Sequence, residues 1–268
     1  MSAEEGRNRR LAGIAARLAT LARNPALHGI AGVFVMKAAI ILANFSLIML
    51  AARVLDTDGF GVFSVLFAAA GLFAVIASLG QNVSIMRWWN EYTAAGDTAT
   101  LKGSLIFSIT TVLVGCAVVG TGFFAWKAYA YDWLLTTAVT LYMIALVIVT
   151  VSAHLVRTAI GVGIGDGFGN LMVSIPALLY LAVVFATGAS GSATYVFFVF
   201  AAGGAACVVL HAILMRLKMR AILPDFASVR PRFHLAEWRA RSLKLWVSSG
   251  LEAVNQYLDV IIISYLLS

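Results

Sequence analysis

Long apolar runs recur along this sequence and constrain its fold more than any other feature. A bilayer core about 30 Å thick needs roughly 20 apolar residues per helical crossing, and a helix satisfies its own backbone polar groups. The chain is 62% hydrophobic and 12% charged, against roughly 25% charged in soluble domains. We therefore predict an all-α polytopic membrane protein, a six-helix transmembrane bundle plus a seventh helix. The predicted spans are 28–52, 60–80, 103–126, 133–155, 168–187, 195–215 and 245–267.

The connections divide the chain into four parts. The first is a basic segment in which Leu11 and Ile14 recur at helical spacing opposite Arg10 and Arg17, which predicts an amphipathic helix on the cytoplasmic surface. The longest connection is basic and reads as a cytoplasmic linker between two groups of helices. The predicted parts are 1–26, the amphipathic segment; 27–215, the six-helix lobe; 216–244, the linker; and 245–268, the seventh helix.

The basic residues predict the orientation of the chain. If the amino terminus is cytoplasmic, the inner connections hold nearly all Arg and Lys residues, and the outer ones hold only Arg53 and Lys127. This arrangement follows the positive-inside rule. It also accounts for the net charge of +7, so we expect contact with membrane lipids and no nucleic-acid partner.

Aromatic residues gather at the predicted span ends, where headgroup anchoring is their ordinary role. They are Trp88, Trp89 and Tyr92 after the second span, Trp126, Tyr129, Tyr131 and Trp133 around the third-to-fourth connection, and Trp246 at the start of the seventh.

Glycines form two groups with different predicted roles. The alternating run from Gly161 to Gly169 fits neither a Walker A motif nor a dinucleotide fingerprint, so we predict a flexible inner loop. Glycines inside spans predict close packing between membrane helices. These are Gly71, Gly115, Gly203 and Gly204.

No catalytic or metal-binding pattern is present in the sequence. The four histidines are scattered without metal spacing, and no Ser/His/Asp set can be assembled. Cys116 and Cys207 fall inside apolar runs and are predicted to be small buried hydrophobes. We therefore expect no enzymatic activity, no catalytic residue, no cofactor and no metal ion.

Ionisable residues inside spans carry most of the functional signal, because a charge near the bilayer centre costs at least about 2.5 kcal/mol and usually faces water or a partner. Lys37, Glu252 and Asp259 are such residues. Glu252, Asn255, Gln256 and Asp259 follow an i, i+3, i+4, i+7 pattern and share one helix face. We predict that this stripe faces a water-filled cavity. The alternative is a seam of interhelical hydrogen bonds.

Lys37 and Asn44 lie seven residues apart on one face of the first span. By the helical rise, Lys37 lies roughly 14 Å and Glu252 roughly 11 Å from the cytoplasmic ends of their helices. We predict that the first and seventh helices face one cavity, with Lys37 available to Glu252 or to an anionic substrate group. A purely structural ion pair is the alternative.

Two stretches carry a resemblance to a known family. Residues 44–92, NFSLIMLAARVLDTDGFGVFSVLFAAAGLFAVIASLGQNVSIMRWWNEY, have an Arg-x-Leu turn at Arg53–Leu55, followed by acidic residues and Phe60-Gly61. The end, LEAVNQYLDVIIISYLLS, has an Asp before an aliphatic run. They resemble the first two spans and the seventh span of the polysaccharide flippases of the multidrug, oligosaccharidyl-lipid and polysaccharide exporter superfamily.

The resemblance implies a transporter of the bacterial inner membrane. Such flippases move undecaprenyl-diphosphate-linked oligosaccharide to the outer leaflet for surface polysaccharide synthesis, through two six-helix lobes around a central cavity. This chain then resembles one lobe and the start of a second, so activity requires a second lobe or another copy. The implied roles are substrate binding by Lys37, Asn44 and Arg53, and cavity lining or ion coupling by Glu252, Asn255, Gln256 and Asp259. A non-transporting scaffold or assembly subunit is the alternative.

Overall fold

The computed structural model describes the backbone of residues 25–267, and the side chains of 32–257 and 262. The described part is almost entirely helical and contains no strand. The amphipathic segment predicted for 1–26 lies almost entirely outside it. The elements are α2 (Pro25–Val54), α3 (Thr57–Ser78), α4 (Gln81–Ala94), α5 (Thr98–Ala128), α6 (Trp133–Ala159), the π-helix η1 (Gly163–Phe168), α7 (Gly169–Thr187), α8 (Ala193–Ile222), the 3-10 helix η2 (Pro224–Ala227) and α9 (Leu235–Leu267).

The structure confirms the predicted all-α membrane bundle. Six helical segments of the described chain are long and apolar enough to cross a membrane: α2, α3, α5, α6, η1 with α7, and α8. They correspond to the first six predicted spans. α9 is not among these segments of the described chain, and its first half carries charged residues such as Glu237, Arg241 and Lys244. The seventh crossing therefore stays a prediction.

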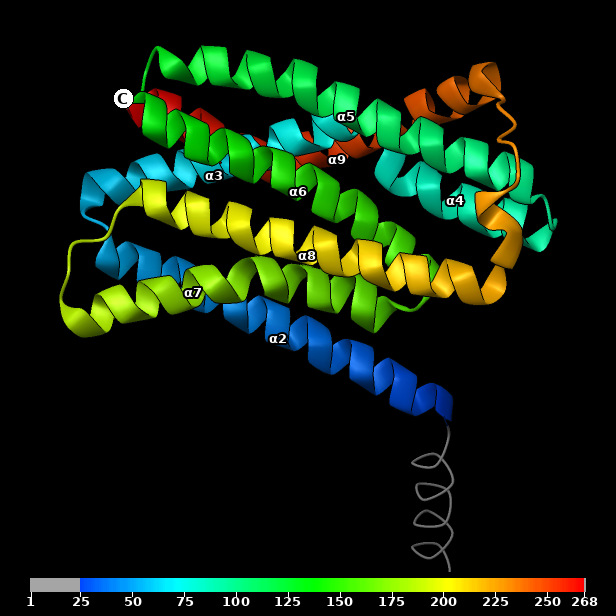
Figure 1. Cartoon of the computed structure of the whole chain (residues 1–268). Coiled ribbons are helices and arrows are strands. Elements are labelled where there is room, and N and C mark those ends of the chain that lie inside the picture. Colours follow the sequence, from blue (N-terminus) through cyan, green and yellow to red (C-terminus); the bar gives the residue numbers. More distant parts are fainter. Residues whose placement is uncertain (1–24, 268) are drawn as a thin grey trace, which may run out of the picture.

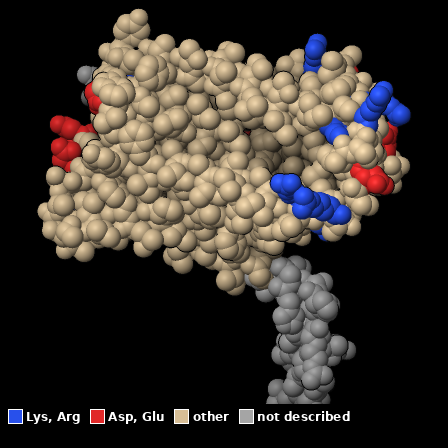
Figure 2. All heavy atoms as spheres, in the orientation of Figure 1, with Lys and Arg blue, Asp and Glu red and all other residues tan. Residues whose placement is uncertain are grey.

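The long helices lie side by side and alternate in direction (Figure 1). α6 is the central helix and packs against α3, α4, α5 and α8, while α2 packs on α7 and η1, and α9 packs on α3 and α4. Figure 2 shows a middle band without charged side chains, and Lys and Arg gathered at the end where α8 ends and α9 begins. We call this the basic end. Such a charge-free belt is what a hydrocarbon core requires.

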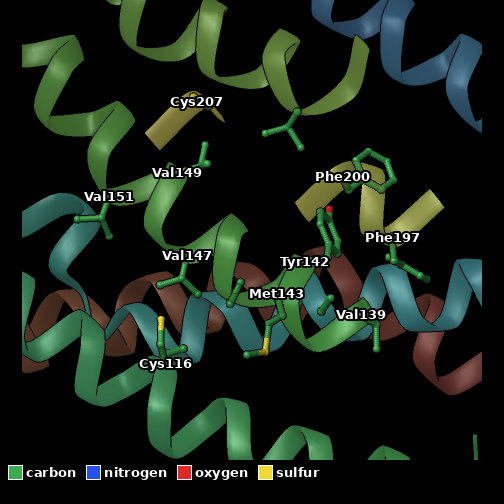
Figure 3. Packing of buried hydrophobic residues seen from close by; sticks show 14 of the residues in the cluster. Cys116, Val139, Tyr142, Met143, Val147, Val149, Val151, Phe197, Phe200 and Cys207 are labelled. Atoms are coloured by element: carbon green, nitrogen blue, oxygen red, sulfur yellow. The ribbon is translucent and has the colours of Figure 1, made fainter. Parts of the chain in front are cut away.

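The core centres on α6, whose buried residues include Val139, Met143 and Val147. Figure 3 shows these side chains between Cys116 of α5 and the residues of α8, including Cys207. Both cysteines are buried and free within this apolar cluster. The prediction that they act as small hydrophobes is confirmed.

Glycines allow the helices to approach closely, as predicted. A Cβ on Gly115 of α5 would collide with the carbonyl of Ala77 on α3, and one on Gly203 of α8 with the carbonyl of Met172 on α7. Gly71 likewise accommodates the ring of Tyr257 from α9. Small residues at such positions are typical of membrane helix packing.

The segment predicted as a linker over 216–244 is folded against the bundle. α8 continues to Ile222, and α9 begins at Leu235 rather than at residue 245. The Arg232 amide donates to the carbonyl of Ala99 at 2.9 Å. Lys102 Nζ donates to three carbonyls at the end of η2 and beyond, which satisfies groups that a helix end leaves unpaired. They belong to Phe226, Ala227 and Val229, at 2.8–3.0 Å.

The predicted headgroup role of Trp88 and Trp89 is wrong, because both side chains are buried. Leu79 and Gly80 adopt left-handed conformations (φ 49° and 73°) that end α3, and the chain resumes as α4 with its apolar face against the bundle. Gly80 and Trp246 also lie in close backbone contact, which places Trp246 against the bundle.

Trp88 of α4, Phe107 of α5 and Trp238 of α9 form an aromatic cluster at the basic end. Their ring centroids are 5.6–5.7 Å apart. Trp238 is fully buried, and its Nε1 donates to the Tyr92 hydroxyl at 2.9 Å. This cluster fixes the start of α9 to the six-helix bundle.

We expect Trp238→Ala to lower the free energy of unfolding by about 3–5 kcal/mol, since it empties a fully packed aromatic site. Trp238→Phe keeps a ring and loses mainly the hydrogen bond, at about 1 kcal/mol. Thermal unfolding in detergent measures both. Trp133→Ala, at a side chain that is 71% exposed, is the control, and an equal effect there would contradict the role of the cluster.

Asp97 caps α5 and gives a pH-dependent prediction. Its carboxylate accepts from the Thr100 amide (3.0 Å) and hydroxyl (2.7 Å) and pairs with Arg232 at 3.4 Å. The Thr100 hydrogen bonds, more than the arginine, hold the pKa of Asp97 below its ordinary value. The ionised cap therefore stabilises the fold above about pH 4, and this stabilisation is lost as the pH falls through the folded-state pKa.

We accordingly expect Asp97→Asn to destabilise the protein at pH 7 by no more than about 1 kcal/mol, because the side chain is partly exposed. The difference from wild type should shrink toward pH 3. Thermal unfolding across this pH range measures it, and a constant difference would show that the charge of Asp97 is not responsible.

Candidate functional site

A polar pocket of about 400 Å³ opens between α2, the end of α6, η1 and the start of α7. It lies toward the basic end of the bundle. The wall along α2 is apolar except for Lys37, and the other polar lining residues come from α6, η1 and α7. The lining residues are Val33, Met36, Lys37, Ile40, Ile41, His154, Arg157, Val162, Gly163, Asp166, Gly167 and Asn170.

The glycine run builds this pocket, so the predicted flexible loop is wrong. Gly161 has a φ of 150°, and the chain then enters η1 and continues into α7. A Cβ on Gly165 would collide with the backbone of α6 at Ala153 and Arg157, and one on Gly167 with Met36 of α2. Glycine thus allows η1 to contact α6 on one side and α2 on the other.

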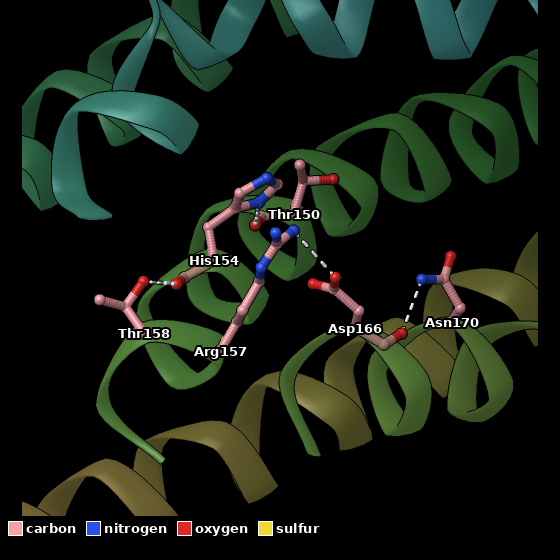
Figure 4. Close-up of polar contacts among 6 residues, drawn as sticks. All are labelled: Thr150, His154, Arg157, Thr158, Asp166 and Asn170. Atoms are coloured by element: carbon pink, nitrogen blue, oxygen red, sulfur yellow. Dashed lines mark hydrogen bonds and ion pairs between the residues drawn. The ribbon is translucent and has the colours of Figure 1, made fainter. Parts of the chain in front are cut away.

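Arg157 and Asp166 form an ion pair across the turn between α6 and η1. Their side chains extend toward one another (Figure 4), with Arg157 Nη1 3.0 Å from Asp166 Oδ2. Asn170 Nδ2 donates to the Asp166 carbonyl at 2.7 Å. The two charged side chains are 42% and 27% exposed, so the pair remains accessible to water and to a ligand in the pocket.

His154 lies one turn before Arg157 on α6. Its Nδ1 is 2.7 Å from the Thr150 carbonyl. Because a carbonyl only accepts, Nδ1 must carry the proton, which leaves Nε2 available as an acceptor in the neutral ring or a donor in the charged one. His154 can therefore serve a ligand in either protonation state.

Lys37 is exposed and lines the same pocket from α2. None of the ion pairs among the described residues includes it. Since Arg157 and Asp166 neutralise each other, the Lys37 ammonium gives the pocket a net positive charge. A compact anion is the ligand that a net positive charge of this kind attracts.

The other two predicted substrate-binding residues lie away from this pocket. Asn44 accepts a hydrogen bond from the Ser174 hydroxyl of α7 at 2.9 Å. Arg53 is exposed in the last turn of α2, at the end opposite to the basic end. The three residues therefore follow α2 along its length without gathering at one place.

The described part of the predicted stripe on α9 is exposed. Glu252, Asn255 and Gln256 are exposed, while Ala253 is buried and Tyr257 packs at Gly71 of α3. The Asp259 side chain lies outside the described residues. Because α9 packs on α3 and α4 whereas α2 packs on α7 and η1, a cavity shared by the two helices stays a prediction. The acidic residue that lines the pocket of Lys37 is Asp166.

Sequence reasoning missed Arg157, Asp166, His154 and Asn170 as site residues. Arg157 counted only as a basic residue of an inner connection, and Asp166 was concealed in a run read as a loop. The sequence did contain a signal for this ion pair. Arg157 and Asp166 are nine residues apart, on either side of the connection between two apolar runs.

Comparison with models of protein families, with curated proteins and with solved structures found no match.

Two glycines of the turn test how the pocket is built. Gly165→Ala places a methyl group against the α6 backbone and should cost about 1–3 kcal/mol through overpacking. Gly163→Ala is the matched control, because a Cβ there meets no atom within 4 Å. Thermal unfolding of both variants measures the contrast, and equal stabilities would mean that η1 does not pack on α6 as described.

Proposed function

We propose that the chain is a transporter of the bacterial inner membrane, with its amino terminus cytoplasmic, that takes part in moving undecaprenyl-diphosphate-linked oligosaccharide for surface polysaccharide synthesis. The observation that supports it best is the net-positive pocket of Lys37, Arg157 and Asp166 within an otherwise apolar bundle. A lipid-linked diphosphate combines a compact anion with a membrane-embedded tail. The resemblance of residues 44–92 to polysaccharide flippases points to the same substrate class.

The pocket offers complementary chemistry for a diphosphate. Lys37 supplies a point charge, and Arg157 a planar fork that binds phosphate oxygens in pairs. The Arg157 guanidinium forms an ion pair with the Asp166 carboxylate. An incoming phosphate would exchange with this carboxylate, so the site need not hold an unpaired arginine between binding events.

A second lobe or another copy of the chain completes the proposed pathway. Only 6% of the apolar window of α2 is buried, the lowest share among the six spans. Glu252, Asn255 and Gln256 of α9 are also exposed. Alternating access in two-lobed transporters requires a body on each side of the substrate. The faces of α2 and α9 are where we place that second body.

A non-transporting scaffold is the second candidate. The hydrogen bond between Asn44 and Ser174 supports it, because it shows a polar residue of α2 used to join two helices. On this reading the polar residues of α2 and α9 serve assembly alone.

Substitutions in the pocket separate these functions. We expect Lys37→Ala and Arg157→Ala each to lower surface polysaccharide in the native bacterium at least about tenfold, the value of one lost charged hydrogen bond, at unchanged protein level. Lys218→Ala, at the same end but outside the pocket, is the control. Surface polysaccharide and membrane-fraction immunoblots measure the two effects. A parallel loss of protein would favour the scaffold, and unchanged polysaccharide would refute transport through this pocket.

A further inference from the structure

A larger cavity, of about 610 Å³, lies between α5 and α8 at the basic end. α5 packs on α3, α4 and α6, whereas α8 packs on α6 and α7. α6 therefore forms the floor of a groove between α5 and α8, and η2 closes one end. Figure 2 shows the surface hollowed beside the last turns of α8, next to Lys and Arg side chains. No residue of this groove belongs to the pocket of Lys37.

The walls of the groove are apolar. Ile109 and Leu113 of α5 line one wall and are more than half exposed, and Val208 and Ala212 of α8 line the other. On the floor, the Ser152 hydroxyl and His211 Nδ1 are 2.9 Å apart and satisfy each other. Within a membrane such a groove opens to acyl chains. None of the residues named here places an unpaired polar group in the groove that would oppose binding of an acyl chain.

Positive charge is confined to one end of the groove. Lys102 is occupied by the carbonyls around η2. Arg216 and Arg220 lie one turn apart on α8, are exposed, and take part in none of the ion pairs among the described residues. Two adjacent guanidinium groups without carboxylate partners favour a phosphate.

The length of the groove matches one leaflet. From Val208 to Arg216 the helical rise gives about 12 Å, and from Val112 to Lys102 on α5 about 15 Å. Half of a hydrocarbon core of about 30 Å is about 15 Å. A chain lying in the groove would thus extend from the bilayer midplane to the arginines.

We propose that this groove binds an anionic phospholipid of the leaflet at the basic end, with an acyl chain between α5 and α8 and the phosphate at Arg216 and Arg220. The occupant is a resident membrane lipid rather than the transported molecule. The proposal is independent of the transport proposal, since it uses other residues and would hold for a scaffold as well.

Native mass spectrometry of the purified full chain tests it, with phosphatidylglycerol and phosphatidylcholine of identical acyl chains as probes. We expect preferential retention of phosphatidylglycerol. Arg216→Gln and Arg220→Gln should each weaken it about fivefold, the value of one basic residue at an anionic surface. Lys218→Gln, on the same turn but outside the groove, should leave retention unchanged.

Ala212→Trp fills the groove without changing its charge and should reduce retention of both lipids. Thermal unfolding of each variant checks that it is folded, and the exposed Gln variants keep the test valid if the Trp variant is not. The proposal is overturned by equal retention of the two lipids in wild type, by an equal loss in Lys218→Gln, or by full retention in a folded Ala212→Trp. Displacement of phosphatidylglycerol by undecaprenyl phosphate at equal concentration would also overturn it, because the groove would then be a substrate site.

Discussion

Exclusion of charge from the middle of the bundle determines where each candidate site lies. A charged group within the hydrocarbon region costs several kcal/mol unless it is paired or hydrated, so most ionisable side chains gather toward the ends (Figure 2). At the basic end some are used to hold the chain together, as Lys102 is by the carbonyls around η2. Other cations line the two candidate sites: Lys37 of α2 lines the polar pocket, and Arg216 and Arg220 of α8 line the apolar groove.

The two pockets differ because different backbone contacts form them. Gly165 and Gly167 draw η1 close to both α6 and α2, so the polar groups at the end of α6 meet Lys37 in a short, compact space. α5 and α8 are not among the closely packed helix pairs of the described chain, and α6 forms a long, mostly apolar floor between them. The first geometry suits a small anion and the second a hydrocarbon chain.

Hydrophobic runs predicted the six described spans to within several residues, because the bilayer thickness sets the length of each apolar run in the sequence. Local changes of backbone conformation could not be predicted from the hydrophobic pattern. The left-handed residues Leu79 and Gly80 split α3 from α4, and the π-turn at Gly163–Phe168 replaced a predicted loop. The pocket itself depends on which helices are neighbours, and that information is in three-dimensional packing. Lys37 was recognised from the sequence, but its neighbours Arg157 and Asp166 were not.

The rotation of α9 about its own axis follows from contacts that do not involve its polar stripe. Trp238 in the aromatic cluster, Ala253, and Tyr257 at Gly71 fix the face turned toward α3 and α4. Glu252 and Ala253 are consecutive, so their directions differ by roughly 100°, and the exposed stripe borders the packed face. The packing of α9 on α3 and α4 therefore does not depend on the polar side chains of the stripe. Substitution of Glu252 or Asn255 should for this reason affect what the stripe meets outside the bundle, while the attachment of α9 is kept.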